Sequence, residues 1–384
     1  MRFLLYICIL LFSINSFGQT TITFDEDGSN KLYIKLYGHI DYNQKIESGK
    51  RNPGKMDVHR LVTLFGYQFN RKTQFVTEIE VEHGNEIFVE QAFVKHRISR
   101  GISLKTGLLL IPMGFINEMH EPTFFYSVER PLLDKNIIPS TWREIGAGIT
   151  GLFPKRSLKY QLYLVNNPIS YNGGSAKING KTGIRSARQK GIKSLVSSIP
   201  GLSGQIEYFG LEGIKVGLSA YYGKTNTALA SQYAGIITDE NTAIVDSSTV
   251  NLSMATVHAS FNKNQWTARF QYTLAGFGNA DKYNAFTSSD VPELMHGFYG
   301  LLAYDLINDQ KITLAPFARF SHLNNHLQVS EAIIQNEALR QNIMTVGVNY
   351  KPDPGVVFKI DYQFYNLGDG TNYQQFNTGV GVWF

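Results

Sequence analysis

The C-terminal end of the chain constrains the fold most, because its residues alternate between two kinds of side chain. One face of this segment is largely apolar and consists of Phe376, Thr378, Val380, Val382 and Phe384. The other face is mostly small or polar and consists of Tyr373, Gln375, Asn377, Gly379, Gly381 and Trp383. Successive side chains of a β-strand point to opposite faces, and membrane-crossing strands alternate in this way. The sequence therefore predicts that the chain ends in a transmembrane β-strand.

The N-terminal end predicts a secreted protein. A basic start at Arg2 is followed by the apolar run 3–12 and by a small-x-small site that ends at Gly18, which is the pattern of a secretory signal peptide. The single cysteine, Cys8, lies inside this segment, so we expect a mature chain without disulfides. The expected division of the chain is a signal peptide (1–18), a short periplasmic segment (19–30) and a barrel (31–384).

The composition favours strands over membrane helices. The chain contains 25 Phe, 21 Tyr and 35 Gly among 384 residues, yet its mean hydropathy is only −0.16. A bundle of membrane helices is more apolar, because each spanning helix needs about 20 consecutive apolar residues. A soluble β-sandwich shares this composition, so the spacing of the strands has to decide between a membrane barrel and a sandwich.

Sixteen segments have the length and the flanking turn residues of β-strands. They span 31–43, 57–70, 73–83, 86–98, 102–110, 142–152, 157–166, 202–210, 213–223, 249–262, 264–275, 293–306, 309–322, 339–351, 355–366 and 372–384. Tight turns alternate with longer loops along the chain, which is the layout of outer-membrane barrels. An even number of strands places both termini on the periplasmic side. We therefore predict an all-β fold, a transmembrane antiparallel β-barrel of about sixteen strands with long external loops.

Alternation also predicts which face of a strand looks inward. In 355–366, Phe358 and Ile360 face one way, whereas Lys359 and Asp361 face the other. A charge on the lipid face costs roughly 2–4 kcal/mol at the middle of the bilayer, so the charged faces are expected to look into a wet lumen. The test leaves the segments 57–70, 86–98 and 249–262 ambiguous. A soluble sandwich with its charged faces in water remains the alternative.

The third external loop, 111–141, is long and rich in proline and aromatic residues. Four prolines stiffen it, and Phe115, Phe124, Phe125 and Tyr126 give it apolar side chains for packing. A barrel of this size is wide enough for an aqueous channel, and long ordered loops usually serve a function. We expect this loop to fold inward as a constriction, with Arg130 and Lys135 lining it. The alternative is an external lid that packs on the rim.

The fourth external loop is strongly basic. Its positive residues are Lys177, Lys181, Arg185, Arg188, Lys190 and Lys193, and no acidic residue lies between Asn167 and Glu207. Such a segment at a pore mouth concentrates anions, and rings of Arg and Lys are typical of anion and phosphate pores. An equally weighted interpretation is a solvated loop that binds lipopolysaccharide phosphates or keeps the surface soluble.

The predicted lumen carries nearly balanced charge. Alternation turns eight bases inward, namely Lys35, Arg60, Lys159, Lys215, Arg269, Lys311, Arg319 and Lys359. It also turns six acids inward, namely Asp41, Glu78, Glu80, Glu82, Glu207 and Asp361. Among the bases, Arg60, Arg269, Arg319 and Lys359 are candidates for lining the lumen or its constriction. A continuous basic ladder cannot be traced from the sequence.

Several motifs of the chain resemble those of the phosphate-selective porin O and P family. They are LKTGLLLIPMGF (104–115), VERP (128–131), WREIGAGITG (142–151), GIRSARQKG (183–191), APFARF (315–320) and VGVNYKPDPGVVFKIDYQF (346–364). The resemblance covers most of the mature chain and implies a passive outer-membrane porin of a Gram-negative bacterium that prefers anions or phosphate and assembles as a homotrimer. Terminal Phe384 also resembles the signal that the outer-membrane assembly machinery reads.

Motifs for catalysis or cofactor binding are lacking in the sequence. His322 and His326 lie near a loop rather than on a helix, and a mature chain without cysteine offers no thiolate for zinc. We therefore predict no catalytic residue, no cofactor, no metal and no nucleic-acid partner. Two alternatives stay open. One is a plugged or ligand-binding barrel without conductance, similar to an adhesin. The other is an outer-membrane lipid hydrolase, for which His258 is the only eligible histidine.

Overall fold

The computed structural model describes residues 20–23, 30–236, 238–309 and 312–384. The expected signal peptide, 1–18, lies outside the described residues, as does the predicted inward base Lys311. Of the expected periplasmic segment, the part from Thr20 to Thr23 is described and forms strand β1.

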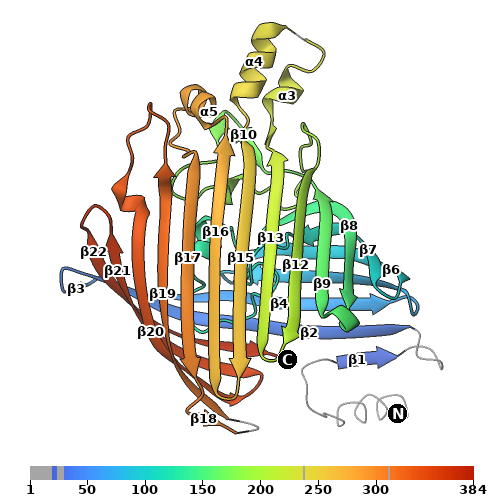
Figure 1. Cartoon of the computed structure of the whole chain (residues 1–384), viewed down its shortest axis with the longest axis vertical. Helices are drawn as coiled ribbons and strands as arrows, with labels where there is room; N and C mark the ends of the chain where they lie inside the picture. The colour runs from blue at the N-terminus through green and yellow to red at the C-terminus, as the bar shows by residue number, and fades with distance from the viewer. Residues whose placement is uncertain (1–19, 24–29, 237, 310–311) are drawn as a thin grey trace.

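Sixteen long antiparallel strands form the wall of a closed barrel (Figure 1). They are β2 (Lys31–Glu47), β4 (Lys55–Gln68), β5 (Thr73–Glu82), β6 (Glu86–Ser99), β7 (Ile102–Leu110), β8 (Arg143–Phe153), β9 (Leu158–Val165), β12 (Gly201–Leu211), β13 (Ile214–Lys224), β15 (Asn251–Lys263), β16 (Trp266–Gly278), β17 (Leu294–Tyr304), β19 (Thr313–Gln328), β20 (Arg340–Asp353), β21 (Val356–Leu367) and β22 (Asn372–Trp383). Each corresponds to one of the segments expected from the sequence, so the predicted strand order is confirmed.

The barrel closes between the first and last long strands. β2 pairs with β4 on one side and with β22 on the other, where Tyr37 lies opposite Trp383. The backbone continues this seam to the last residue, because Leu36 N donates to Phe384 O (2.7 Å) and Phe384 N donates to Leu36 O (2.8 Å). Closure leaves no free strand edge in the wall, which a barrel in a membrane requires.

Some short strands belong to the sheet of the wall, and others form a sheet of their own. β1, β3 (Lys50–Arg51) and β18 (Ile307–Asn308) belong to the same sheet, whereas β10 (Ile169–Asn172), β11 (Ser175–Ala176) and β14 (Asn226–Thr227) form a small separate sheet. β10 and β14 come from the loops after β9 and β13, so this small sheet ties two long loops together. The long loops are therefore structured rather than loose.

The helical segments are short and lie in the connections. α3 (Leu229–Gln232), α4 (Asp239–Ser247) and α5 (Ala280–Thr287) stand above the long-loop end of the barrel, at the top of Figure 1. α2 (Leu133–Asn136) lies in loop 111–141, and three 3₁₀ turns are η1 (Pro154–Arg156), η2 (Arg185–Ala187) and η3 (Glu337–Leu339). In the described part of the chain, no helix has the length and apolar character that crossing a membrane demands.

The barrel is apolar outside and polar inside. On β21, Phe358 and Ile360 are 49% and 55% exposed, whereas Lys359 and Asp361 are only 4% and 1% exposed. Exposed apolar side chains recur on most of the long strands, and a band of this size is unfavourable in water. This is the reverse of a soluble sandwich, which keeps its apolar faces in a core. The membrane barrel is therefore the correct choice between the two expectations.

Candidate functional site

Loop 111–141 folds into the barrel. One buried side chain, that of Asn117, joins the start of the loop to its end. Asn117 Nδ2 donates to Ile111 O (2.7 Å) and to Trp142 O (2.9 Å), while Trp142 N donates to Asn117 Oδ1 (2.8 Å). Asn117 is 1% exposed. These three bonds satisfy the backbone where the loop leaves β7 and enters β8, so the loop begins and ends at one fixed point.

The first half of the loop is bound to the inner faces of β13 and β16. Gly114 N donates to Ser219 Oγ (3.2 Å), and Phe115 N donates to Gln271 Oε1 (3.0 Å). The amide of the same glutamine donates to Asp134 Oδ1 (2.9 Å) in α2. Gln271 thus holds both halves of the loop, and it does so from the interior of the wall.

Two predicted lumen bases contact the loop backbone. Arg269 Nη1 donates to Phe124 O (2.8 Å), and its guanidinium lies 4.1 Å from the centre of the Phe124 ring. Lys359 Nζ donates to Phe125 O (2.5 Å) and to Ser127 O (3.1 Å). Both bases face the interior, as alternation predicts, and each donates to carbonyls of the loop. Their position indicates that they hold the loop.

Two further predicted bases are buried in the wall, where one contacts hydroxyl groups and the other a carboxylate. Arg319 donates to Ser127 Oγ in the loop and to Thr345 Oγ1 (3.3 Å) on β20. Arg60 Nε lies 3.4 Å from Glu80 Oε1, and both side chains are 3% exposed. The carboxylate of Glu80 therefore offsets the charge of Arg60 inside the barrel.

A buried histidine is an anchor that the sequence did not reveal. His120 Nε2 lies 3.1 Å from Glu90 Oε1 and 2.8 Å from the hydroxyl of Tyr37. Glu90 belongs to β6 and Tyr37 to β2, so His120 attaches the loop to two more strands. The spacing along the chain does not indicate this group, because Glu90 and Tyr37 lie 30 and 83 residues from His120.

A cavity of about 1100 Å³ lies between loop 111–141, the fourth external loop and the wall near β2, β4 and β5. Among the described residues, nine bases line it: Arg60, Arg130, Lys135, Arg143, Lys181, Arg185, Arg188, Lys190 and Arg319. Five carboxylates also line it: Asp41, Glu80, Glu82, Glu86 and Glu129. Most of these bases come from the two loops, and most of these acids come from the wall. The two loops therefore supply most of the positive charge that lines the cavity.

Eight of the twelve predicted site residues line this cavity, and four do not. The eight are Arg60, Arg130, Lys135, Lys181, Arg185, Arg188, Lys190 and Arg319. Arg269 and Lys359 lie under the loop, as described above. Lys177 donates to Ser175 Oγ (2.8 Å) on the exposed surface, and Lys193 is exposed. The structure thus gathers the middle of the fourth loop at the cavity and leaves its two flanking lysines outside.

Arg188 joins the two loops that carry most of the bases. Its guanidinium donates to Ser140 O in loop 111–141 and, through Nε, to Arg185 O (2.9 Å). Burial, followed by the neighbouring charges of Arg185 and Arg143, lowers the pKa of Arg188 to about 10. Because this pKa stays well above 7, the guanidinium is charged at neutral pH and contributes to the positive side of the cavity.

Two clusters of described residues carry side chains that bind metals, namely His39, Asp41 and His59, and Glu78, Glu90 and His120. The second cluster is buried and belongs to the loop anchor described above. The first lies on the cavity wall.

His258 does not have the position that a lipid hydrolase requires. It is 1% exposed on β15, and its ring centre lies 4.4 Å from that of Phe115 in the inward loop. A hydrolase acting on lipid needs its histidine at the lipid boundary, beside a serine. The position of His258 therefore does not support the lipid-hydrolase alternative.

Among the comparisons with known proteins, the solved structures give information on the fold. No protein-family model matches the chain. An uncharacterised protein of Aquifex aeolicus (strain VF5) is 28% identical over 346 residues, which cover 85% of this chain and 74% of that protein. Its description adds no function.

Three solved structures of outer-membrane channels have the same fold. The outer-membrane channel DcaP of Acinetobacter baumannii aligns with a TM-score of 0.60 at 10% identity, over 94% of this chain and 99% of that chain. OmpF of Salmonella typhi, solved with daunomycin, aligns with 0.59 at 11% identity, over 95% and 100%. An anion-selective porin from Comamonas acidovorans aligns with 0.56 at 10% identity, over 92% and 100%. At these identities the likeness establishes the fold alone.

Proposed function

We propose that this protein is a passive porin in the outer membrane of a Gram-negative bacterium. It conducts small hydrophilic solutes through a water-filled lumen that loop 111–141 narrows, with a preference for anions. The observation that carries the anion preference is the lining of the cavity, with nine bases against five carboxylates among the described residues. The excess of positive charge concentrates anions at the entrance, because the net charge that lines a cleft sets the sign of the potential inside it.

The proposed preference is modest. Glu82 and Glu86 also line the cavity, and they repel anions that have passed the basic loops. Phosphate fits the basic side, because guanidinium groups bind its oxygens through paired hydrogen bonds. The resemblance to phosphate-selective porins supports phosphate as one of the solutes, and the shared fold with an anion-selective porin is compatible with it.

We also propose how the barrel is oriented and assembled in the outer membrane. We place both termini in the periplasm, because the start of β2 and the end of β22 lie at the end of the barrel that carries the tight turns. Terminal Phe384 is the residue that we expect the outer-membrane assembly machinery to recognise. The barrel associates as a homotrimer, as the family resemblance implies.

The loop also supports a second candidate function, a plugged barrel that binds a ligand at its outer face. Loop 111–141 contacts inward side chains from β2, β6, β13, β16, β19 and β21. A segment attached on so many sides is able to occlude the lumen. Conductance of the purified protein separates the two candidates, since a plugged barrel passes no current.

Neutralising cavity bases tests the anion preference. We expect Arg185→Gln together with Lys190→Gln to shift the reversal potential in a potassium chloride gradient toward that of an unselective pore. Stability should barely change, because exposed charges contribute little to folding. The matched control is Lys177→Gln with Lys193→Gln, which removes two positive charges from the same loop but outside the cavity. Equal shifts for both pairs, or none for the first, would contradict the assignment.

A further inference from the structure

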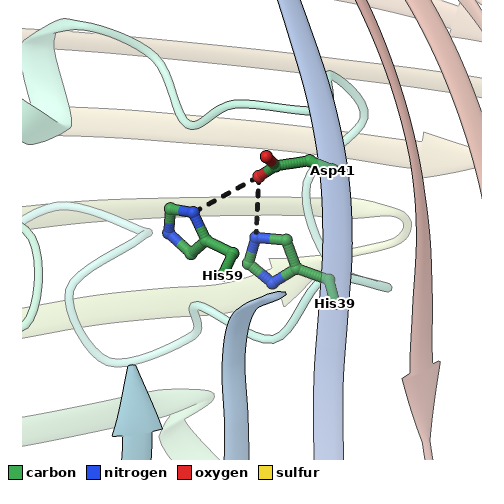
Figure 2. Close-up of side chains that lie close together, drawn as sticks. All are labelled: His39, Asp41 and His59. Atoms are coloured by element: carbon green, nitrogen blue, oxygen red, sulfur yellow. Dashed lines mark ion pairs between the residues drawn. The ribbon is translucent and has the colours of Figure 1, made fainter. Parts of the chain in front are cut away.

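Two histidines and an aspartate meet on the cavity wall (Figure 2). Figure 2 shows both imidazole rings turned toward the Asp41 carboxylate, with His59 Nδ1 at 3.3 Å and His39 Nε2 at 3.7 Å from Asp41 Oδ2. The ligand atoms of the three side chains all lie within 4.8 Å of one another. Two imidazoles and one carboxylate are a common ligand set for divalent transition metals.

A bulge in β4 brings His59 into this group. His39 pairs with Arg60 and Asp41 pairs with Asp57, so two residues of β4 lie opposite Ile40 alone. In a regular ladder, neighbouring residues alternate between the two faces, and His59 would point outward if Arg60 points inward. With the extra residue both line the cavity, whereas Val58 and Leu61 are exposed outside. Bulges commonly re-aim a side chain next to a functional site.

The group is held in place but not saturated. Asn43 Nδ2 donates to Asp41 Oδ1 (3.1 Å), which leaves Oδ2 directed at the histidines. His39 is 93% buried, since its exposed fraction is 7%, and its Nδ1 has no hydrogen-bond partner among the described residues. By contrast, neighbouring His83 Nδ1 is bonded to Asp57 Oδ2 at 2.5 Å. The other ring nitrogen, Nε2, faces Asp41, so Nε2 is the atom that His39 offers to an ion in the cluster.

We propose that His39, Asp41 and His59 bind one divalent transition-metal ion, of the Zn²⁺ type, with its remaining position open to the cavity. Zn²⁺ binds imidazole nitrogen and carboxylate oxygen at about 2.0–2.2 Å, so two of its ligand atoms lie roughly 3.3 Å apart in a tetrahedral site. The His59–Asp41 distance of 3.3 Å matches this value, the His39–Asp41 distance of 3.7 Å is slightly longer, and all three ligand atoms lie within 4.8 Å of one another. Mg²⁺ and Ca²⁺ fit less well, because they prefer oxygen ligands.

The rings must also turn for their lone pairs to converge. The two imidazoles are stacked, with centres 4.3 Å apart and an angle of 24° between their planes. His39 is enclosed, but the His59 side chain is 33% exposed toward the cavity, so it has room to rotate onto the ion. The same exposure gives the ion a route from the cavity to the site.

Nearby positive charges do not prevent binding. The positive charges of Arg60, Lys359 and Arg130 act on His39. The charge of Arg60 is offset by Glu80, and Lys359 is solvated by two loop carbonyls. Asp41 supplies one negative charge directly to the ion. Glu80 and Asp41 thereby reduce the repulsion that the neighbouring bases exert on a bound cation.

Equilibrium binding of Zn²⁺ to the purified, tag-free, full-length mature protein tests the proposal without requiring conductance. After removal of metal with a chelator, we expect one Zn²⁺ per chain. We expect His39→Asn and His59→Asn each to weaken binding by at least about tenfold, because even the loss of a group that supports a ligand costs that much. His83→Asn is the matched control, since His83 lies on the same wall but outside the cluster.

Asp41→Asn provides a second variant of unchanged volume if a histidine variant fails to fold, and heat-modifiable mobility on gels reports folding. The same loss of binding in Asp41→Asn supports the site. Absence of Zn²⁺ binding to the parent protein overturns it. So does binding that resists the changes at 39, 41 and 59, or binding that falls most in His83→Asn.

Discussion

At the scale of single residues, buried charges in this barrel hold a loop. Lys359 is 4% exposed, and both carbonyls that it contacts belong to loop 111–141. A charged group taken out of water is tolerated only where hydrogen bonds replace its hydration. Here the loop backbone supplies those bonds, and the lysine in turn satisfies carbonyls that the lumen would otherwise leave unpaired.

Replacing Lys359 with Met should loosen the loop but not the barrel. The change keeps the length of the side chain and leaves the carbonyls of Phe125 and Ser127 unpaired, at a cost of roughly 1–3 kcal/mol for each buried group. We expect amide hydrogen exchange within 122–128 to accelerate about tenfold or more, while exchange in the strands stays unchanged. Lys215→Met, at an exposed lysine of β13, is the control. Unaltered exchange in 122–128 would show that Lys359 does not restrain the loop.

The residues that the sequence could not place are those whose partners are distant in the chain. A period of two predicts that Lys359 and Arg269 point inward, and they do. It does not reveal the loop carbonyls that they contact, because those lie more than 140 residues away. Alternation did not predict the direction of the His59 side chain for another reason. The bulge in β4 interrupts the period of two at this position.

At the scale of elements, ordered connections dominate the long-loop end. Helix α4 is attached through Asp246, whose carboxylate accepts from Lys224 Nζ at 2.9 Å and lies 3.5 Å from Lys282 Nζ. The backbone carbonyl of Asp246 also accepts from Asn279 Nδ2 at 2.9 Å. One residue therefore connects α4 with the end of β13 and with the start of α5.

The attachment of α4 should depend on acid. The hydrogen bond from Lys224, aided by the charges of Lys224 and Lys282, lowers the pKa of Asp246 below its usual 3.8. A lowered pKa means that the stabilisation is present above about 3.8 and is lost as the pH falls through the folded-state value. We expect pepsin to cleave 229–247 at pH 2 but not at pH 4, relative to an unfolded peptide of the same sequence.

Two variants separate this effect from general acid damage. Asp246→Asn should be cleaved at similar relative rates at both values of pH, because its side chain does not titrate. Asp239→Asn, at the first residue of the same helix, should behave like the parent protein. A parent protein that is equally resistant at pH 2 and pH 4 would contradict the role given to Asp246.

At the scale of the whole molecule, the sequence predicts the strands of the barrel wall better than the loops and charges inside the barrel. Each expected strand appears, because alternation and tight turns are local signals. The inward path of loop 111–141 also follows the expectation from its prolines and aromatic residues. The distribution of charge in the cavity does not, since it depends on how two loops meet, and Arg188 joins them through a contact with Ser140.

The most direct test is the current through the purified protein in a planar bilayer, with potassium chloride at different concentrations on the two sides. We expect discrete conducting channels and a reversal potential of the sign that chloride permeation produces, with chloride current reduced when phosphate is added. A barrel that carries no current would contradict the account and favour the plugged, ligand-binding alternative. Conducting channels that prefer potassium would retain the pore but refute the role assigned to the basic loops.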